Sequence, residues 1–294
     1  MKILITGING MLGTALNDAL KDKHELFGLD IVNSDGAGNF NVDLTDFDAT
    51  RKSIIKINPD IVIHTAALTD VDKCETDPDL AYKLNSVATR NVAVSCQRFD
   101  AALLYISTDY VFSDAPSKVH KDGYTEFDEV CPVSVYARSK YEGERYVKSL
   151  LNKYYIVRTS WLYGSKRKNF VTQIAEALKN GKPANMAEDM VSSPTYANDL
   201  AEAITKLVES EKYGLYHVTN SGLASRYEIA LEISKMLGMP MSNVKKVKLK
   251  ELNLPAVRPS FSAMKNYVWQ LSGFEPIRPW QEAVKEFLQE NKYF

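Results

Sequence analysis

Short apolar runs alternate with longer segments of helical periodicity through the first half of the chain. The runs are KILIT (2–6), ELFGLD (25–30), DIVIHTAA (60–67), ALLYIST (102–108) and YYIVRTSW (154–161). Between them, residues 47–57 and 80–96 place apolar side chains three and four positions apart, as helices that face a core do. Strands that alternate with helices in this way predict a parallel sheet with crossover helices. The fold class is therefore α/β, a Rossmann-type doubly wound parallel sheet.

The pattern becomes less regular after Gly164. A helical run, FVTQIAEALKNG (170–181), is followed by a segment that contains proline, and one more strand, YGLYHVT (213–219), is expected to return to the main sheet. Residues 223–294 carry five prolines and indicate helices joined by irregular loops. We predict a dinucleotide-binding domain of residues 1–164 plus about 191–222. A smaller, mostly helical substrate-binding domain takes about 165–190 plus 223–294.

Composition restricts the classes of protein and partner. The chain has 294 residues, 45% of them hydrophobic, which suffices for a large core. It has no run of 18 apolar residues and no signal-peptide pattern at its N-terminus, so we expect a cytoplasmic protein without a membrane partner. A net charge of −1 gives no general attraction to nucleic acid. Any bound anion must be held by a local site.

The cysteines and histidines suggest packing rather than chemistry. Cys74, Cys96 and Cys131 are far apart and form no C-x-x-C pair, which excludes a disulfide framework and a zinc site and leaves reduced, packed thiols. Among the four histidines, His64 is expected to pack at the end of a strand. No histidine spacing indicates a catalytic or metal site.

Three glycines follow the first strand directly, at Gly7, Gly10 and Gly13. Glycine permits positive φ and close approach of a ligand to the backbone, and a helix that begins there offers free N–H groups to phosphate. The first two glycines stand one residue further apart than in G-x-G-x-x-G, and no Gly-Lys-Ser/Thr follows, which disfavours a P-loop. Asp30, twenty residues after Gly10, can accept hydrogen bonds from ribose hydroxyls and favours NAD. A nicotinamide dinucleotide fits better than the alternative, a tight turn with no ligand.

Two further segments stand where strands end and helices begin, "YISTDYVF" and "YARSK". Tyr136 and Lys140 are four residues apart and share one helix face. Such a pair is common by chance in a chain with 16 tyrosines, and an exposed pair is the plain alternative. A hydroxyl at the end of a strand, Ser107 or Thr108, and the glycine turn together favour a catalytic role for this pair.

A set of motifs in a fixed order resembles one family over nearly the whole chain. The motifs are ITGINGMLG, HTAALTDVDKCE, STDYVF, YARSK, RTSWLYG, SSPTYANDLA, GLYHVTNSG and RPSFS. They resemble the extended short-chain dehydrogenases/reductases and, within them, the dTDP-4-dehydrorhamnose reductase family. The resemblance implies reduction of the 4-keto group of a nucleotide-activated 6-deoxyhexose by NADPH or NADH.

The resemblance also implies roles for single residues. The catalytic residues are Thr108, Tyr136 and Lys140. The predicted cofactor contacts combine those that the resemblance implies with the glycine turn, the acid that ends the second strand and the hydroxyl at the end of the strand before YARSK. They are Gly7, Asn9, Gly10, Met11, Leu12, Gly13, Asp30, Asp43, Leu44, Ala66, Ala67, Asn85, Ser107, Tyr136 and Lys140. The substrate contacts are Thr108, Tyr110, Trp161, Asn169 and Arg258.

Ketone reduction gives the catalytic assignments an independent reason. Negative charge develops on the carbonyl oxygen, so a proton donor and a hydrogen-bond donor are needed there. Tyr136 can supply the proton, and the ammonium of Lys140 is expected to lower the pKa of Tyr136 from about 10 toward neutral pH. Lys140 can also hold the nicotinamide ribose, and Thr108 can hydrogen-bond the carbonyl oxygen.

The substrate contacts compete with plainer interpretations. An arginine before proline, such as Arg258, is often a surface residue, yet its fork suits the phosphates of a nucleotide sugar. Trp161 can line the sugar or pack in the core, and Tyr163 is expected to pack. The cations of residues 166–168 suggest a solvated loop whose charge draws an anionic substrate toward Asn169.

Related activities remain as alternatives. In the similar dehydratases of this superfamily, the strand ends with Thr-Asp-Glu, and the glutamate abstracts a proton. This chain has Tyr110 in the third position, which disfavours dehydration. An epimerase is not excluded, nor is a non-catalytic relative such as the regulatory subunit of methionine adenosyltransferase. Some members bind magnesium through a glutamate where this chain has Ala15, so no metal is expected. The sequence leaves open whether the chain forms a homodimer.

Overall fold

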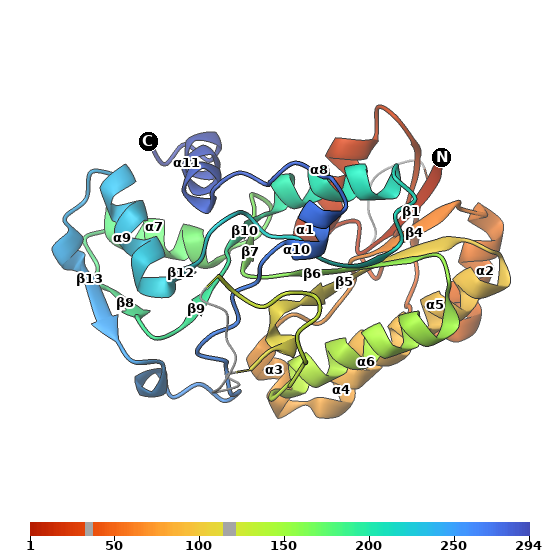
Figure 1. Ribbon diagram of the computed structural model, residues 1–294, viewed down its shortest axis with the longest axis horizontal. Helices are drawn as coiled ribbons and strands as arrows, with labels where there is room; N and C mark the ends of the chain where they lie inside the picture. The colour runs from red at the N-terminus through yellow and green to blue at the C-terminus, as the bar shows by residue number, and fades with distance from the viewer. Residues whose placement is uncertain (33–37, 114–121) are drawn as a thin grey trace.

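The computed structural model describes residues 1–32, 38–113 and 122–294. Its centre is a parallel sheet of seven strands in the order β11-β6-β5-β4-β1-β2-β3 (Figure 1). All six apolar runs predicted as strands lie in it: β1 (Lys2–Thr6), β2 (Glu25–Asp30), β4 (Ile61–His64), β5 (Ala102–Thr108), β6 (Tyr154–Thr159) and β11 (Gly214–His217). The short strand β3 (Asn39–Asn41) was not predicted. The α/β fold class is confirmed.

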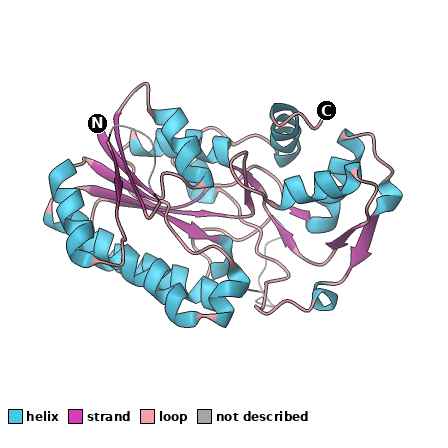
Figure 2. Ribbon diagram, turned by 180° about the vertical axis from the view of Figure 1, so that it is seen from behind, coloured by secondary structure: helices cyan, strands magenta, loops and turns pink. Residues whose placement is uncertain are grey.

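Helices cover both faces of the sheet (Figures 1 and 2). One face carries α1 (Met11–Leu20), α8 (Ala197–Val208) and α10 (Tyr267–Leu271), and the other carries α2 (Phe47–Ile57), α5 (Ala88–Arg98) and α6 (Val135–Leu150). Side chains of a strand alternate between faces, so Ile3 and Ile5 pack with α1 and α8 while Leu4 packs with α2 and α5. Burial on both faces explains why these strands are continuous apolar runs.

The segment predicted as one helix over residues 80–96 consists of three pieces. These are α4 (Pro78–Tyr82), a π-helical turn η1 (Lys83–Val87) and α5. Asp77 caps α4, and α3 (Val71–Thr76) precedes it with Asp70 as its cap. Apolar periodicity is nearly the same through a π turn and an α-helix, so the sequence pattern alone does not reveal it.

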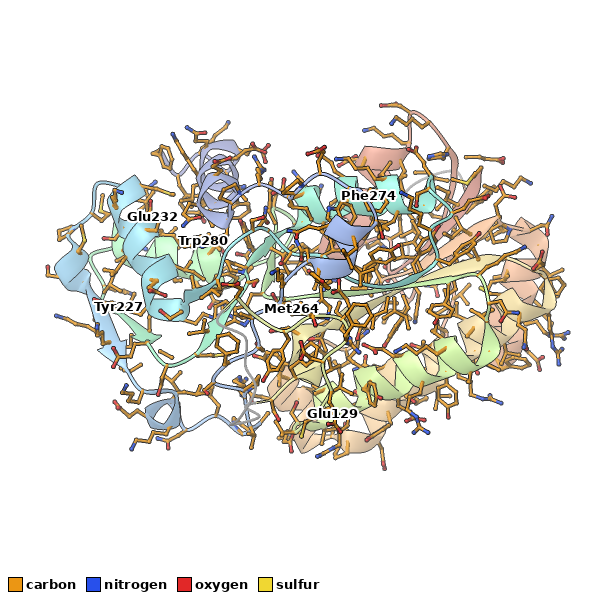
Figure 3. All side chains as sticks on the ribbon, in the orientation of Figure 1. Glu129, Tyr227, Glu232, Met264, Phe274 and Trp280 are labelled. Atoms are coloured by element: carbon orange, nitrogen blue, oxygen red, sulfur yellow. The ribbon has the colours of Figure 1, made fainter. Side chains whose placement is uncertain are left out.

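The remaining elements lie beside the sheet, on the left of Figure 1, where Figure 3 labels Tyr227 and Trp280. They are three small sheets and three helices, with short 3₁₀ turns η2 (Asp109–Val111), η3 (Met241–Asn243) and η4 (Leu249–Leu252). The strands pair as β8 (Ala184–Ala187) with β13 (Val244–Val247), β9 (Val191–Ser192) with β12 (Ala224–Ser225), and β7 (Leu162–Tyr163) with β10 (Thr195–Tyr196). The helices α7 (Phe170–Lys179), α9 (Arg226–Met236) and α11 (Trp280–Glu290) share one apolar core.

The division into two domains stays a prediction. β11 joins the main sheet, and α8 packs against α1, as the predicted segment 191–222 requires. Trp269 of α10, however, packs in the same cluster as α1 and α8, although the predicted division assigns α10 to the second domain. Phe274, labelled in Figure 3, stacks on Trp269 at 4.3 Å between ring centres.

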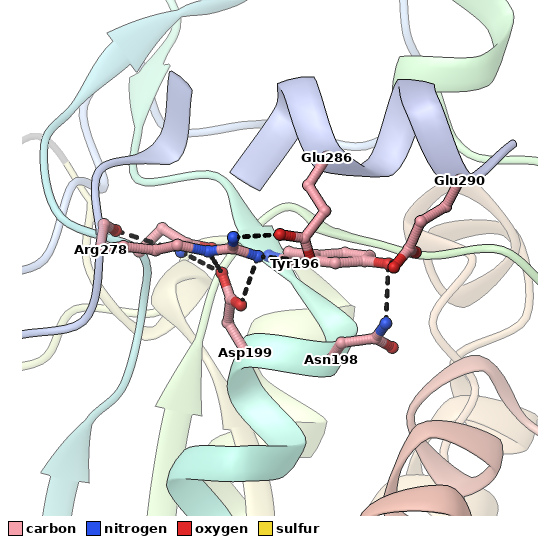
Figure 4. Close-up of polar contacts among 7 residues, drawn as sticks. Tyr196, Asn198, Asp199, Arg278, Glu286 and Glu290 are labelled. Atoms are coloured by element: carbon pink, nitrogen blue, oxygen red, sulfur yellow. Dashed lines mark hydrogen bonds and ion pairs between the residues drawn. The ribbon is translucent and has the colours of Figure 1, made fainter. Parts of the chain in front are cut away.

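A polar network ties the C-terminal helix to α8 (Figure 4). Arg278 donates to Asp199 at the start of α8 and to Glu286 of α11. Tyr196 donates to Glu290 of α11 and accepts a hydrogen bond from Asn198. The network therefore fixes the end of the chain to a helix that packs on the main sheet.

Two sequence expectations about packing are tested here. Cys74 and Cys96 are buried as predicted, but Cys131 is exposed, so its prediction as a packing residue is wrong. His64 is buried between the hydroxyls of Thr6 and Thr89, and burial, with the nearby Lys140, lowers the pKa of His64 to about 3.

Among the described residues, no cluster of acidic, histidine and cysteine side chains is placed to bind a metal. In the same part of the chain, no helix has the length and apolar character to cross a membrane.

Candidate active site

The glycine turn lies at the carboxyl end of β1, the edge where parallel sheets of this type bind ligands. Gly7 has a φ of +71°, and a Cβ there would lie 2.9 Å from the backbone nitrogen of Ala66. Gly10 stands at the N-cap of α1, which has no capping side chain and no acidic residue in its first turn. The N–H groups of Met11 and Leu12 and the positive end of the helix dipole are therefore available to a phosphate.

Gly13 serves the packing of α1 on the turn. A Cβ at Gly13 would lie 2.2 Å from the carbonyl oxygen of Gly7 and 2.8 Å from Ile8. We expect Gly13→Ala to lower the free energy of unfolding by roughly 1–3 kcal/mol, because the helix and the turn must separate. Urea denaturation measures this change, and fluorescence titration with NADPH is expected to show weaker binding.

Gly181→Ala is the control for that prediction, since nothing lies within 4 Å of a Cβ there and only the φ of +66° opposes it. The control is expected to leave NADPH affinity unchanged. An unaltered stability of Gly13→Ala would contradict the packing role.

Asp30 ends β2 beside the turn. Its carboxylate accepts the backbone N–H of Asn9 at 3.0 Å and that of Val32 at 3.2 Å. The side chain of Asn9 in turn donates to the carbonyl of Val32. The acid predicted to meet the ribose is thus held at the turn, and the contact itself stays a prediction.

The residues predicted near adenine follow β3. Hydrogen bonds from the backbone and hydroxyl of Thr45 lower the pKa of Asp43. Leu44 is buried, and its carbonyl accepts the amide of Asn91 at 3.0 Å. Asp43 and Leu44 therefore belong to a rigid loop at the carboxyl edge of the sheet.

Asn85 is buried in the π-helical turn and is fully engaged by the protein. Its amide accepts the N–H of Leu68 at 2.8 Å, and donates to the carbonyl of Leu68 at 3.0 Å and to the hydroxyl of Ser139 at 3.1 Å. The loop after β4, which contains Ala66 and Ala67, is thereby held against α6. A direct contact of Asn85 with the cofactor stays a prediction.

Two of the predicted catalytic residues, Thr108 and Tyr136, come together at the end of β5. Thr108 is the last residue of β5, and Tyr136 lies in the first turn of α6, which Ser134 caps. Burial raises the pKa of Tyr136 well above its ordinary value of 10, and hydrogen bonding with Thr108 only partly opposes this. The sequence argument expected Lys140 to lower this pKa, but burial dominates, and the nearby charges of Asp109 and Tyr110 raise the pKa further. Tyr136 is therefore protonated at neutral pH, as a proton donor must be.

Lys140 lies one helical turn after Tyr136 and is buried. Its Nζ lies 4.2 Å from the centre of the Tyr105 ring, and the Tyr105 hydroxyl donates to the Lys140 carbonyl. Burial lowers the pKa of Lys140 to about 7, although the charge of Glu144 opposes the shift. Proton loss and gain at Lys140 thus occur near neutral pH.

Two acidic residues of this site were missed by the sequence analysis. Asp109 is buried beside Thr108, whose hydroxyl donates to it at 3.1 Å, and it also accepts the hydroxyls of Ser192 at 2.8 Å and Ser262 at 2.5 Å. Burial raises the pKa of Asp109 to about 6, and these hydrogen bonds oppose the rise. The second is Glu144, which accepts the hydroxyl of Ser107 at 2.6 Å. The Ser107 hydroxyl is therefore occupied within the protein, and its cofactor contact stays a prediction.

Two predicted substrate contacts are aromatic. Tyr110 packs edge-to-face on Tyr136, with 6.0 Å between ring centres. Trp161, just after β6, has a φ of +41°, a conformation that is strained for a bulky side chain. Tyr163 is buried against Tyr196 and Phe287, which confirms its prediction as a packing residue.

Asn169 and Arg258 are occupied within the protein. The Asn169 amide caps α7 and donates to the carbonyl of Gly164 at 2.8 Å. The Arg258 guanidinium makes two parallel hydrogen bonds to Asp72, at 2.9 Å and 2.7 Å. Their contacts with substrate stay predictions. The loop of residues 165–168 is exposed, as predicted.

Arg226, the first residue of α9, was also missed. Its guanidinium lies 3.8 Å from the ring centre of Trp161 and 3.9 Å from that of Phe170. The sequence contains the signal S-x-x-E, because Ser225 and Glu228 form a capping box that marks the start of this helix. Nothing in the sequence, however, indicates that the helix begins beside Trp161.

The chain is similar to known proteins over nearly its whole length. The family model described as the RmlD substrate binding domain matches residues 1–293. The dTDP-4-dehydrorhamnose reductase of Mycolicibacterium smegmatis is 34% identical over 292 residues, which cover 97% of this chain and 84% of that protein. The spore coat polysaccharide biosynthesis protein SpsK of Bacillus subtilis is 34% identical over 289 residues, covering 98% of this chain and 97% of that protein.

A solved structure extends the match to three dimensions. The dTDP-4-dehydrorhamnose reductase of Bacillus anthracis, in complex with NADP, is 38% identical with a TM-score of 0.91. The match covers 98% of this chain and 99% of that chain. Family model, sequence relatives and solved structure thus agree over nearly the full length. The chain belongs to the RmlD substrate-binding-domain family, the family of the dTDP-4-dehydrorhamnose reductases.

Proposed function

We propose that the chain reduces the 4-keto group of a nucleotide-activated 6-deoxyhexose with NADPH or NADH, converting dTDP-4-dehydrorhamnose to dTDP-rhamnose. One observation carries the proposal. The Tyr136 phenol and the Thr108 hydroxyl interact at the end of β5, and Lys140 follows on the same helix face. A protonated phenol beside a hydroxyl suits the oxygen of a carbonyl group that gains negative charge.

The residues present fit a nicotinamide dinucleotide. The turn of Gly7 and Gly10 leaves room that a Cβ would fill, and α1 offers uncapped N–H groups to the pyrophosphate. Asp30, at the end of β2, is placed for the adenosine ribose. When bound, the nicotinamide supplies the hydride.

The chain's own residues then act on the carbonyl oxygen. The Thr108 hydroxyl turns its proton from Asp109 to this oxygen and orients it, and Tyr136 gives up its phenolic proton as negative charge develops there. The ammonium of Lys140 stabilises the phenolate that Tyr136 becomes. Carbon gains a hydride and oxygen gains a proton, which together make the alcohol.

An assay of the purified chain tests the proposal. Enzymatically prepared dTDP-4-dehydrorhamnose is added with NADPH or NADH, and loss of the reduced nicotinamide absorbance is followed. We expect turnover, with dTDP-rhamnose identified by chromatography against a standard. If the protein binds both cofactors but oxidises neither, the reductase proposal fails and the non-catalytic alternative gains support.

The same assay compares the cofactors. The carboxylate of Asp30 favours ribose hydroxyls over a 2′-phosphate, whereas the Bacillus anthracis reductase was solved with NADP. The ratio of kcat/KM for NADH and NADPH decides between them.

Arg258→Ala is expected to raise KM for the nucleotide sugar by roughly 10- to 100-fold, because a charge-assisted hydrogen bond to phosphate is lost. Steady-state kinetics measure KM at saturating cofactor. Asp72→Asn is the control, since it removes the partner seen at 2.7 Å and keeps the arginine. An unchanged KM in Arg258→Ala would rule out its contact with the diphosphate.

We also propose a cytoplasmic location and keep a homodimer as the predicted assembly. Light scattering of the purified chain, with and without NADPH, measures its molar mass. A monomer in both conditions would contradict the homodimer.

A further inference from the structure

The guanidinium of Arg226 has no hydrogen bond or ion pair in the described part of the chain. Its Nη1 atom is buried without a partner, and the residue as a whole is half-buried, so part of the side chain stays accessible. Two aromatic rings contact the group, Trp161 at 3.8 Å and Phe170 at 3.9 Å from the guanidinium carbon to the ring centres. A buried donor without an acceptor is unfavourable, which indicates that an acceptor arrives with a ligand.

The other buried or half-buried arginines of this region each have a carboxylate partner, although the Nη1 atom of Arg158 is also buried without a hydrogen bond. Arg158 pairs with Glu144, Arg258 with Asp72, and Arg278 with both Asp199 and Glu286. The residue predicted to bind phosphate, Arg258, thus already has a carboxylate partner. Arg226 has none among the residues described.

Arg226 lies among the predicted substrate contacts. Its guanidinium lies over the rings of Trp161 and Phe170, and Phe170 directly follows Asn169. The charges of Tyr110, Asp109 and Arg258 all act on its pKa. Tyr110 in turn packs on Tyr136, so the cation lies two side chains from the predicted proton donor.

We propose that Arg226 binds the diphosphate of the nucleotide sugar, together with Arg258. This inference rests on the proposed function, since it names the residue that recognises the anionic part of that substrate. A guanidinium that two rings restrain, with its donors unpaired among the described residues, can donate a pair of hydrogen bonds to phosphate oxygens.

Charge favours a diphosphate over a neutral hydroxyl as the acceptor. Arg226 and Arg258 bring two positive charges to this region, and Asp72 balances that of Arg258. Burial lowers the pKa of Arg226 to about 10, so it stays charged at neutral pH. The nearby Asp109 is a weak counterion, because burial raises its pKa to about 6 and three hydroxyls already occupy it.

The test compares a charged ligand with its uncharged part. The full chain, saturated with NADP⁺, is titrated with dTDP by calorimetry and with thymidine by ligand-observed NMR. We expect Arg226→Gln to weaken dTDP binding by roughly 10- to 100-fold and to leave thymidine binding unchanged. Arg226→Lys keeps the charge without the fork and is expected to lose less. Salt is expected to weaken dTDP binding more in the native chain than in Arg226→Gln.

Arg138→Gln is the matched control, because Arg138 is exposed on α6 and bonds only the carbonyl of Val133. It is expected to bind dTDP like the native chain. Unchanged dTDP affinity in Arg226→Gln would overturn the proposal. Equal loss for thymidine and dTDP would overturn it too, since it would indicate a packing role.

The outcomes also separate this inference from the proposed function. If dTDP binding depends on Arg226 but dTDP-4-dehydrorhamnose is not reduced, the reductase proposal fails and the anion site stands. If reduction proceeds and KM is the same in Arg226→Gln, the reductase proposal stands and the role of Arg226 is refuted.

Discussion

Tyr136→Phe is expected to lower kcat by roughly 10²–10⁴-fold while NADPH binding is retained, because only the proton donor is removed. Phenylalanine keeps the ring that packs edge-to-face on Tyr110, so the shape of the site is preserved. The group lost is the phenolic hydroxyl. Burial raises the pKa of this hydroxyl, and the hydrogen bond with Thr108 only partly opposes the rise. Substrate binding depends on other side chains and is expected to change little.

Stopped-flow kinetics with dTDP-4-dehydrorhamnose measure the rate of NADPH oxidation, and fluorescence titration measures NADPH affinity. Tyr146→Phe is the matched control, since Tyr146 lies on the same helix ten residues further on. The control is expected to show native activity. Full activity in Tyr136→Phe would refute its role as the acid, and lost NADPH binding would indicate a structural role instead.

Glu144→Gln is expected to lower the free energy of unfolding by roughly 3–5 kcal/mol, because it leaves a buried charge on Arg158. Both side chains are almost fully buried, and Arg158 makes two hydrogen bonds of 2.8 Å to the carboxylate. Ser107 donates a third at 2.6 Å. The pair joins α6, which carries Tyr136 and Lys140, to the ends of β5 and β6.

The pair also sets a dependence of stability on pH. Burial opposes ionisation of Glu144, but the charge and hydrogen bonds of Arg158 hold its pKa below the ordinary value of 4.5. A lowered pKa in the folded chain means that this stability is present above the ordinary value. It is lost as pH falls through the lowered pKa.

Urea denaturation at neutral pH measures the change. Glu142→Gln is the matched control, because Glu142 pairs with Arg145 on the exposed side of the same helix and is expected to change stability by less than about 1 kcal/mol. If Glu144→Gln does not fold, Glu144→Leu with Arg158→Met removes both charges and is expected to recover most of the stability. A Glu144→Gln variant as stable as the native chain would contradict the buried-charge argument.

The elements that the sequence predicts correctly are those with local causes. Continuous apolar runs mark strands that are buried on both faces. The three glycines mark a turn, in which the positive φ at position 7 favours glycine. The spacing of Tyr136 and Lys140 places both on one face of α6. Each of these signals lies within a few residues, so no knowledge of the remaining chain is needed.

Other features depend on partners that are distant in the chain. The carboxylate of Asp72 occupies Arg258 from 186 residues away, and Asp109 holds Ser262 across 153 residues. The residues that neighbour Arg258 and Asp109 in the sequence do not indicate these pairs.

The sequence by itself therefore determined the α/β architecture, the glycine turn and the Tyr-Lys helix, because periodicity and spacing act locally. Only the tertiary structure decided the protonation and the partners of the site residues. Burial raises the pKa of Tyr136 against the expected effect of Lys140, and it leaves the Nη1 atom of Arg226, beside the rings of Trp161 and Phe170, without an acceptor among the described residues. Solvation depends on everything packed around a group, and that environment exists only once the chain has folded.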